Sequence, residues 1–411
     1  MSDKYFWEIG SEPPEIEIHS TKKHDVLREY LNKYIKIVGG YHFRKTLNIT
    51  LVDGFAGGGI YKGLDGGLYD GSPLIFLNST EAAAKELSLT KDFDLDAGYI
   101  FVDEQPQFLA YLRSVLIERN YGSRIGQSIH LLEGSFEFNV EGIITYIKDR
   151  TGHANRCIFL LDQYGYSAVP IHTLRRIFSE LPKSEVIITL NVDSLIDYLT
   201  NNPQCETILK NLGIGYELQR LETDKTQRGW RYVLQHYFYR EIVKNSGAKF
   251  YTNFFIKTSE SHRSYWLLHL SMHMTARNEM QKIHWDLTNH FIHEGQHGLH
   301  MLAYRPEFDD EYSGQQSFIF SSDDREINHK LILRELPNFI PESPQPIKDI
   351  YKGFCNSSTT TLEMFTDVLQ DLHLNRQIDV ISKKGNKRRE GSKLNSNDLI
   401  CLPKQYLLYF K

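Results

Sequence analysis

The sequence of 411 residues contains only four cysteines and no excess of positive charge. The cysteines stand at positions 157, 205, 355 and 401 and form neither a C-x-x-C pair nor a zinc-ligand spacing. We therefore expect no disulfide scaffold and no structural metal. The formal net charge of −5 excludes a general polyanion binder, so any contact with nucleic acid must come from a local basic patch.

Long apolar runs are also missing. No stretch approaches the roughly 20 apolar residues that cross a bilayer, so we expect no membrane partner. Residues 1–14 lack the basic and apolar regions of a signal peptide, which predicts a cytoplasmic protein.

Short apolar runs alternate with amphipathic segments up to about residue 287. A helix is expected at His24–Val38, and five strands that alternate with helices are expected at Leu47–Val52, Gly98–Val102, Ser128–Leu132, Cys157–Leu161 and Glu185–Leu190. This alternation favours an α/β domain whose mostly parallel sheet is covered on both faces. Two later runs, Phe250–Lys257 and Tyr265–Met274, favour a seven-stranded sheet over a dinucleotide-binding Rossmann sheet.

The pattern divides the chain into four parts. Residues 1–19 are an N-terminal arm, residues 20–295 the α/β domain, residues 296–330 a linker or insertion, and residues 331–411 a second domain. In the second domain, Ser357–Thr361 caps a helix that runs to about residue 372. Strands at 377–381, 398–402 and 406–410 follow, and this order resembles a winged helix.

A basic turn lies between the first two of these late strands. Its charged residues are Lys383, Lys384, Lys387, Arg388 and Arg389. As a wing, the turn would contact phosphates of DNA or RNA, and binding would weaken strongly with salt. A solvated hairpin tip is an equally open interpretation.

The first motif with chemical content follows the first strand, in Leu51-Val-Asp-Gly-Phe-Ala-Gly-Gly-Gly59. Glycine lets a backbone approach a ligand closely. An acid at the strand end can receive an ammonium, and main-chain N–H groups can meet a carboxylate. These are the two charged groups of the methionine moiety of S-adenosylmethionine, which we expect to lie against Asp53, Phe55, Ala56, Gly57 and Gly59.

Other uses of this glycine-rich turn are less favoured. The dinucleotide fingerprint G-x-G-x-x-G would need glycine where Lys62 stands, and a P-loop would need Gly-Lys-Ser/Thr, which is absent here. A glycine-rich turn with a solvated aspartate is the plain structural alternative.

Two further strand ends complete the predicted cofactor site. Asp103 or Glu104 follows the second strand and suits a pair of ribose hydroxyls, because a carboxylate accepts two hydrogen bonds. One of these two acids could instead cap the next helix. Ser135 and Phe136 follow the third strand, where a polar group could meet the adenine amine; an ordinary turn is the default there.

The fourth strand is followed by Asp162-Gln163-Tyr164-Gly165. In amino-methyltransferases, an Asp/Asn-Pro-Pro-aromatic loop at this place accepts hydrogen bonds from the target amine and stacks its ring on a flipped base. We therefore assign Asp162 to the amine and Tyr164 to the base. Gln163 stands where such loops have proline, so their rigidity is missing. A surface turn that caps the next helix is the alternative.

These residues together resemble the three-Cys-motif partner (TcmP) family. The resemblance covers residues 21–289 and rests on Lys23-His24, Asp53-Gly-Phe-Ala-Gly57, Gly71-Ser-Pro73, Phe101-Val-Asp-Glu104 and Asp162-Gln-Tyr-Gly165 with Pro170. It implies a class I methyltransferase-like fold and pairing with a three-Cys-motif, radical-SAM-like protein of the phage Gp37/Gp68 type. The family usually has Asp-Pro-Phe-Gly at 162–165, so the difference at Gln163 bears on turnover rather than on fold.

The residues predict methyl transfer from S-adenosylmethionine to an exocyclic amine of a nucleic-acid base. A non-catalytic nucleotide- or nucleic-acid-binding partner protein is the alternative. A remote third hypothesis is a zinc hydrolase, because His293, Glu294 and His297 satisfy H-E-x-x-H. Gly295 and Gly298 disfavour the helix that this motif needs, and surface histidines are the plainer interpretation.

Overall fold

The computed structural model describes residues 5–152, 155–163, 169–226, 230–257, 264–287, 293–294, 317–318 and 322–403. These residues form two compact units, Met1–Ile283 and His284–Lys411, each with its own buried core. None of the described helices is both long enough and apolar enough to cross a membrane.

Unit 1 is built on one seven-stranded sheet. Its strands, in spatial order, are β5 (Ile129–Glu133), β4 (Asp94–Asp103), β1 (Thr46–Asp53), β6 (Arg156–Leu161), β7 (Lys183–Leu190), β9 (Ser264–Ser271) and β8 (Phe250–Lys257). The first five pair in parallel, and β9 is antiparallel to both of its neighbours. An antiparallel last strand inserted between β7 and β8 distinguishes this sheet from the Rossmann order. The fold is therefore class I methyltransferase-like, as expected.

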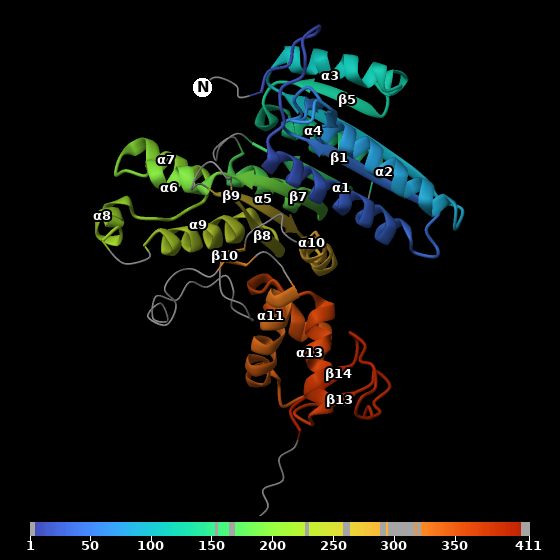
Figure 1. Ribbon diagram of the computed structural model, residues 1–411, viewed down its shortest axis with the longest axis vertical. Helices are drawn as coiled ribbons and strands as arrows, with labels where there is room; N and C mark the ends of the chain where they lie inside the picture. The colour runs from blue at the N-terminus through green and yellow to red at the C-terminus, as the bar shows by residue number, and fades with distance from the viewer. Residues whose placement is uncertain are drawn as a thin grey trace, which may run out of the picture. The chain divides into compact units, whose positions relative to one another are not determined.

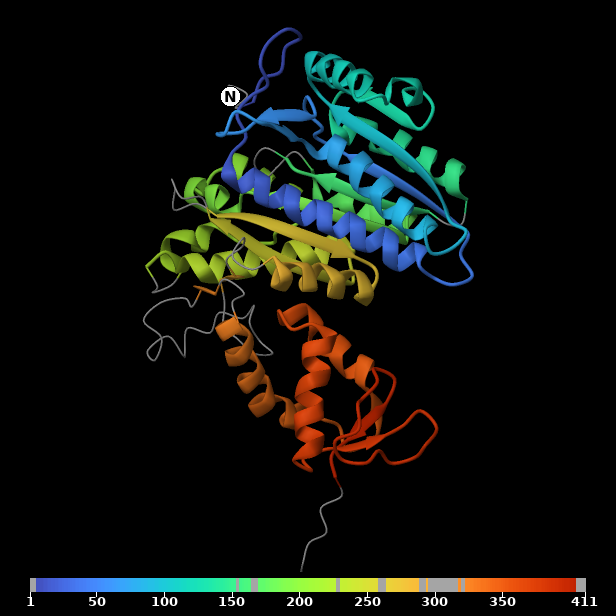
Figure 2. The ribbon, with the colours of Figure 1, turned by 45° about the vertical axis from the view of Figure 1, so that its right-hand side comes forward.

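The central strands are buried along nearly their whole length. In β6 the five residues after Arg156 are all buried, and so are the last five residues of β1. Such strands need helices on both faces. Figures 1 and 2 show α1 (Ile18–Gly39) and α2 (Ser72–Ser88) in front of the sheet, with α4 (Phe136–Thr151) behind it.

The remaining helices of unit 1 follow the strands in chain order. They are α3 (Pro106–Glu118), α5 (Ile171–Glu180), α6 (Val192–Tyr198), α7 (Pro203–Asn211), α8 (Leu221–Asp224), α9 (Trp230–Ser246) and α10 (Met274–Asp286). The described part of 193–248 is thus largely helical.

Several boundaries differ from the sequence expectations. Helix α1 begins six residues before His24. The predicted strand Tyr265–Met274 ends at Ser271, because Met274 already begins α10. An unexpected hairpin, β2 (Ile60–Lys62) with β3 (Leu68–Asp70), follows the glycine-rich turn.

Unit 2 has six main elements. In chain order these are α11 (Ser322–Glu335), β12 (Gln345–Pro346), α12 (Ile347–Phe354), α13 (Leu362–Leu374), β13 (Asp379–Ile381) and β14 (Leu399–Cys401). The strands form an antiparallel sheet in the order β12-β14-β13. Phe365, Val368, Leu369 and Leu372 recur at helical spacing and are fully buried, so α13 forms the core. Thr361 caps α13 as expected, whereas the strand expected at 406–410 lies outside the described residues.

Candidate functional site

Three acidic residues stand at one edge of the sheet of unit 1. Asp103 ends β4, Asp53 ends β1, and Asp162 directly follows β6. These strands are neighbours and run parallel, so their carboxyl ends meet at the same edge. The charges of Asp162 and Asp103 both raise the pKa of Asp53, which reflects how closely the three groups lie. Ligands of α/β proteins bind at this edge.

Asp53 is fully buried. Its Oδ1 accepts a hydrogen bond from the Phe55 N–H at 3.1 Å. Its Oδ2 is buried and no described residue has hydrogen-bond geometry to it, although the Ser72 hydroxyl lies close enough to lower the pKa of the carboxyl group. Burial raises the pKa of Asp53 to about 7, although the Ser72 hydroxyl and the Phe55 N–H oppose this rise. A buried oxygen without a donor favours a ligand that brings a cation or an N–H or O–H group.

Asp103 holds the glycine-rich turn against the end of β4. Its Oδ2 accepts the Gly57 N–H and its Oδ1 accepts the Gln105 N–H, both at 2.9 Å. The neighbouring Glu104 is exposed. Of the two acids left open by the sequence, Asp103 is therefore the one that faces the turn.

The backbone of the turn is largely used within the protein. Gly54 N–H donates to the Leu160 carbonyl and Ala56 N–H to the Val102 carbonyl, both at 2.9 Å. With the Phe55 and Gly57 N–H groups bound to Asp53 and Asp103, four consecutive N–H groups are engaged. These four donors are therefore not available to a ligand. A ligand at this turn would instead be held by the fit of its surface against the backbone.

The N-terminal arm lies on the same turn. Trp7 is 3% exposed and donates its Nε1–H to the Ile60 carbonyl at 2.8 Å. A β-carbon at Gly57 or Gly58 would come within 2.9 Å or 2.3 Å of the indole ring. Glycine at these two positions is thus required by the contact with Trp7, and at Gly57 also by a φ of 58°. This contact was not predicted from the sequence, which pointed to a ligand, with a plain glycine-rich turn as the alternative.

Asp162 forms an ion pair with Lys23 of α1. The Lys23 Nζ lies 2.5 Å from the Asp162 Oδ2, and the side chains are 14% and 31% exposed. Burial raises the pKa of Asp162, but the Lys23 ammonium is the largest of several influences that together outweigh burial and hold this pKa below its usual range. Asp162 is therefore an ionised hydrogen-bond acceptor at neutral pH.

Gln163 turns its side chain into the protein. It is 3% exposed, and its Oε1 accepts the Val169 N–H at 3.0 Å. This bond joins the residues on either side of 164–168, so Gln163 makes a side-chain contact where a proline could not. Tyr164 lies outside the described residues.

The residues after β5 have structural roles. The Ser135 hydroxyl accepts the Phe138 N–H at 3.1 Å and caps α4. Phe136 is 2% exposed, and its ring meets that of Phe159 with centroids 6.1 Å apart. Ser135 and Phe136 thus already have partners within the protein.

The basic turn of unit 2 is partly neutralised. Lys387 pairs with Asp379 at 2.6 Å, and the Arg388 Nη2 pairs with Asp398 at 2.9 Å. Lys383, Lys384 and Arg389 are exposed. These three residues are more accessible than Arg388, which is half-buried.

The zinc hypothesis needs a helix that carries His293, Glu294 and His297. The described part of this motif is not helical. His293 and Glu294 form the short strand β10, which pairs with β11 (Ser317–Phe318). The backbone of this pair is therefore extended and does not start a zinc-binding helix. His297 lies outside the described residues.

The sequence was compared with known families and characterised proteins. No protein-family model matches it. No characterised protein with a significantly similar sequence was found.

Solved structures give distant similarities. The protein LPL1258 of Legionella pneumophila is 11% identical with a TM-score of 0.40, over 67% of this chain and 93% of that one. The bifunctional kinase-methyltransferase WbdD is 15% identical with a TM-score of 0.31, over 61% and 39% of the two chains. A human methyltransferase 10 domain containing protein is 8% identical with a TM-score of 0.27, over 60% and 82%.

Proposed function

We propose that unit 1 is an S-adenosylmethionine-dependent methyltransferase that acts on an exocyclic amine of a nucleic-acid base. The observation that carries this proposal is the row of Asp103, Asp53 and Asp162 at the carboxyl ends of three neighbouring parallel strands. Its central member has a buried oxygen that lacks a donor among the described residues. The row suits a ligand that carries both an ammonium and hydroxyl groups.

Each part of the cofactor has a matching group. Asp53 would receive the ammonium, with the turn from Phe55 to Gly59 as the adjoining wall. Asp103 would accept the ribose hydroxyls, because it faces the glycine-rich turn and a carboxylate can accept several hydrogen bonds. When bound, S-adenosylmethionine supplies an electrophilic methyl group on a sulfonium.

The remaining steps belong to the protein. Asp162, kept ionised by Lys23, would accept a hydrogen bond from the target amine and orient its lone pair. Tyr164 would cover the base. Rate enhancement would come from placement of the reacting atoms, because the proposed methyl transfer needs no strong general base.

The same site also supports a non-catalytic binding protein as a second candidate. Lys23 already occupies the carboxylate that the amine would need, and Trp7 covers part of the glycine-rich turn. In a protein that binds the cofactor or nucleic acid without turnover, neither the ion pair of Lys23 nor the position of Trp7 would interfere with function.

Calorimetry with the full chain tests cofactor binding. We expect S-adenosylmethionine to bind the wild type and to bind Asp53→Asn at least about tenfold more weakly, because the charged partner of the ammonium is lost. Asp94→Asn is the matched control, since Asp94 is an exposed acid at the opposite end of β4. Absence of binding to the wild type would contradict the proposal.

A methyl-transfer assay separates the two candidates. Labelled cofactor is incubated with a mixed DNA and RNA pool, and label in nucleic acid is counted. The methyltransferase proposal expects incorporation that Asp162→Ala abolishes while cofactor binding persists. Binding without incorporation favours the non-catalytic candidate.

The C-terminal unit and the partner complete the proposal. The order helix, strand, two helices and two strands, with β14 in the centre, supports a winged-helix unit that touches DNA or RNA. Pairing with a three-Cys-motif protein rests on the sequence resemblance. Co-expression of such a protein with this chain, followed by affinity purification, tests the pairing.

A further inference from the structure

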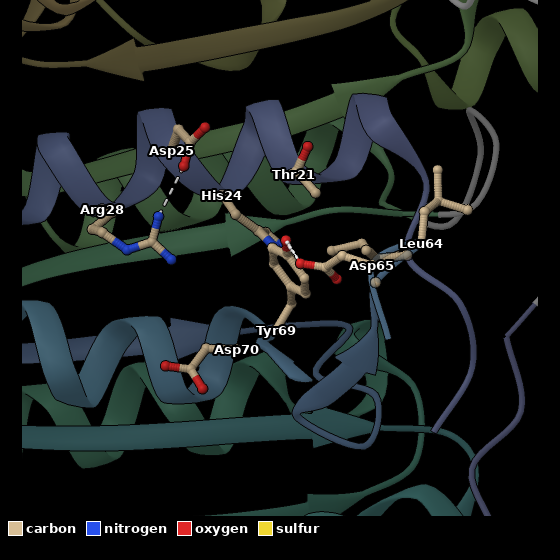
Figure 3. A pocket seen from close by; sticks show the side chains of 10 residues that line it. Thr21, His24, Asp25, Arg28, Leu64, Asp65, Tyr69 and Asp70 are labelled. Atoms are coloured by element: carbon tan, nitrogen blue, oxygen red, sulfur yellow. Dashed lines mark hydrogen bonds and ion pairs between the residues drawn. The ribbon is translucent and has the colours of Figure 1, made fainter. Parts of the chain in front are cut away.

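A cavity of about 480 Å³ lies between α1 and the β2–β3 hairpin. This volume is typical of small-molecule sites. Figure 3 shows Thr21, His24, Asp25 and Arg28 on α1, with the ring of Tyr69 from the hairpin beside them. The four α1 residues recur at i, i+3, i+4 and i+7, so one helix face forms one wall of the cavity.

His24 is the least exposed polar group in this wall. It is 9% exposed, and neither ring nitrogen bonds to another residue within the described part of the chain. Its ring lies 5.9 Å from the ring of Tyr61, measured between centroids. A buried histidine that lines a cavity without partners leaves one N–H donor and one acceptor for a ligand.

His24 is neutral at physiological pH. Burial, and after it the positive charge of Lys23, lowers the pKa of His24 to about 3. A neutral imidazole can both donate to and accept from the edge of a heterocycle, which a charged one cannot.

The charge of the cavity selects against phosphates. Asp25, Asp65 and Asp70 contribute −3 and Arg28 contributes +1, so the lining carries a net charge of −2 with His24 neutral. Arg28 is held by Asp25 at 2.9 Å. The lining therefore favours a neutral or cationic ligand that is rich in N–H donors.

The hairpin wall offers an aromatic face beside its acids. The Tyr69 hydroxyl donates to Asp65 Oδ2 at 3.0 Å, and the Tyr69 side chain is 40% exposed. A partly exposed ring at a cavity wall is suited to stacking on a flat heterocycle. Among the described residues, no three histidine, cysteine, aspartate or glutamate side chains are grouped as metal ligands, so the acids are not arranged for a cation.

We propose that this cavity binds a nucleobase that carries an exocyclic amine. His24 reads the ring edge, Tyr69 stacks on the ring, and the acids of the hairpin accept the amine. This base site is separate from the proposed catalytic one, where Asp162 receives the target amine; that the bound base belongs to the methylated nucleic acid rests on the proposed function. Lys23 supports this link, because it reaches Asp162 from the residue next to His24.

Ligand-observed NMR and calorimetry on the full chain test the proposal. The probes are adenosine, cytidine and guanosine, which carry the amine, and uridine, which does not. We expect at least one of the first three to bind, and uridine to bind about tenfold more weakly or not at all. Spermidine serves as a cation without a ring.

Two variants locate the binding. His24→Ala and Tyr69→Ala should each weaken nucleoside binding about tenfold. The control His42→Ala removes an exposed histidine elsewhere and should leave binding unchanged. If His24→Ala fails to fold, Tyr69→Ala decides the test, since its side chain is 40% exposed.

The proposal is overturned if none of the three nucleosides binds, if both variants bind like the wild type, or if spermidine alone binds. Titration of the same proteins with S-adenosylmethionine keeps the two proposals apart. Normal cofactor binding without nucleoside binding would remove this cavity as a base site and leave the proposed reaction. If nucleosides bind but S-adenosylmethionine does not, the proposed reaction is removed and the cavity remains a base site.

Discussion

The ammonium of Lys23 lies 2.5 Å from the Oδ2 of Asp162, although 139 positions separate the two residues in the sequence. The ion pair ties α1 to the end of β6, next to the other two acids of the row. The carboxylate that the proposed function assigns to the target amine thus already has a cationic partner. An amine that reaches Asp162 must share this carboxylate with Lys23.

Replacement Lys23→Met should destabilise unit 1 by about 1–2 kcal/mol at pH 7, because a mostly buried carboxylate loses its partner while remaining partly hydrated. Asp162 has a lowered pKa in the folded state, so its contribution is fully present above the unfolded pKa of about 4 and is lost as the pH falls through the lower folded pKa. Urea unfolding at pH 7 and at a series of lower pH values down to about pH 2 measures both effects.

Lys22→Met is the matched control for this variant, since the structure shows no ion pair for Lys22 among the described residues. It should change stability by no more than about 0.5 kcal/mol. Equal stability of Lys23→Met and the wild type at pH 7, or a loss that does not shrink as the pH falls toward about 2, would show that the ion pair is not the cause.

The carboxyl group of Asp53 should make the stability of unit 1 depend on pH in the opposite direction. Its folded pKa of about 7 lies above its unfolded value, so the folded state binds the extra proton. This contribution to stability is fully present below about pH 4 and is lost as the pH rises toward 7. Relative to Asp53→Asn, the wild type should become less stable between pH 5 and pH 7. Urea unfolding across this range gives the difference, and parallel curves for both proteins would contradict the assignment.

Trp7 should oppose cofactor binding. The indole ring contacts Gly57 and Gly58, so a ligand reaches this part of the turn only after the arm moves. Trp7→Ala removes that requirement and should tighten S-adenosylmethionine binding about three- to tenfold. Calorimetry measures the change, with Phe6→Ala as control because Phe6 is 52% exposed on the same arm. Weaker binding by Trp7→Ala alone would mean that the ring is a wall of the site.

The parallel strands could be predicted because each is a continuous buried run between amphipathic helices, as in β6. The acids could be located for the same reason: Asp53, Asp103 and Asp162 are each the first polar residue at the end of such a run. The β2–β3 hairpin could not, because its strands have three residues each and only Ile60 among them is buried. A periodic pattern of apolar residues cannot be recognised in strands of that length.

Contacts distant in sequence were also beyond prediction. Lys23 meets Asp162 only because α1 crosses the sheet at a particular position, and nothing local to either residue indicates this. The sequence gives a weak indication of the Trp7 contact, because a large aromatic residue in a polar arm often packs on a buried surface. The choice between Asp103 and Glu104 likewise depended on which side of β4 faces the glycine-rich turn.

The basic turn of unit 2 should separate into structural and binding residues. Arg388 pairs with Asp398, which is 2% exposed, so Arg388→Ala should destabilise unit 2 by about 2–4 kcal/mol. Lys383→Ala with Lys384→Ala removes two exposed charges and should leave stability nearly unchanged. Thermal unfolding of the two variants measures this contrast.

The same variants test the wing through salt dependence. If Lys383 and Lys384 contact phosphates, the double variant should reduce the slope of log affinity against log salt by about 1.4–1.8, the sum for two contacts. The slope is measured by titrating a fluorescent single-stranded oligonucleotide at several salt concentrations. An unchanged slope would make the turn a solvated hairpin tip. An Arg388→Ala variant that stays as stable as the wild type but no longer binds would instead make Arg388 the nucleic-acid contact, and its pairing with Asp398 secondary.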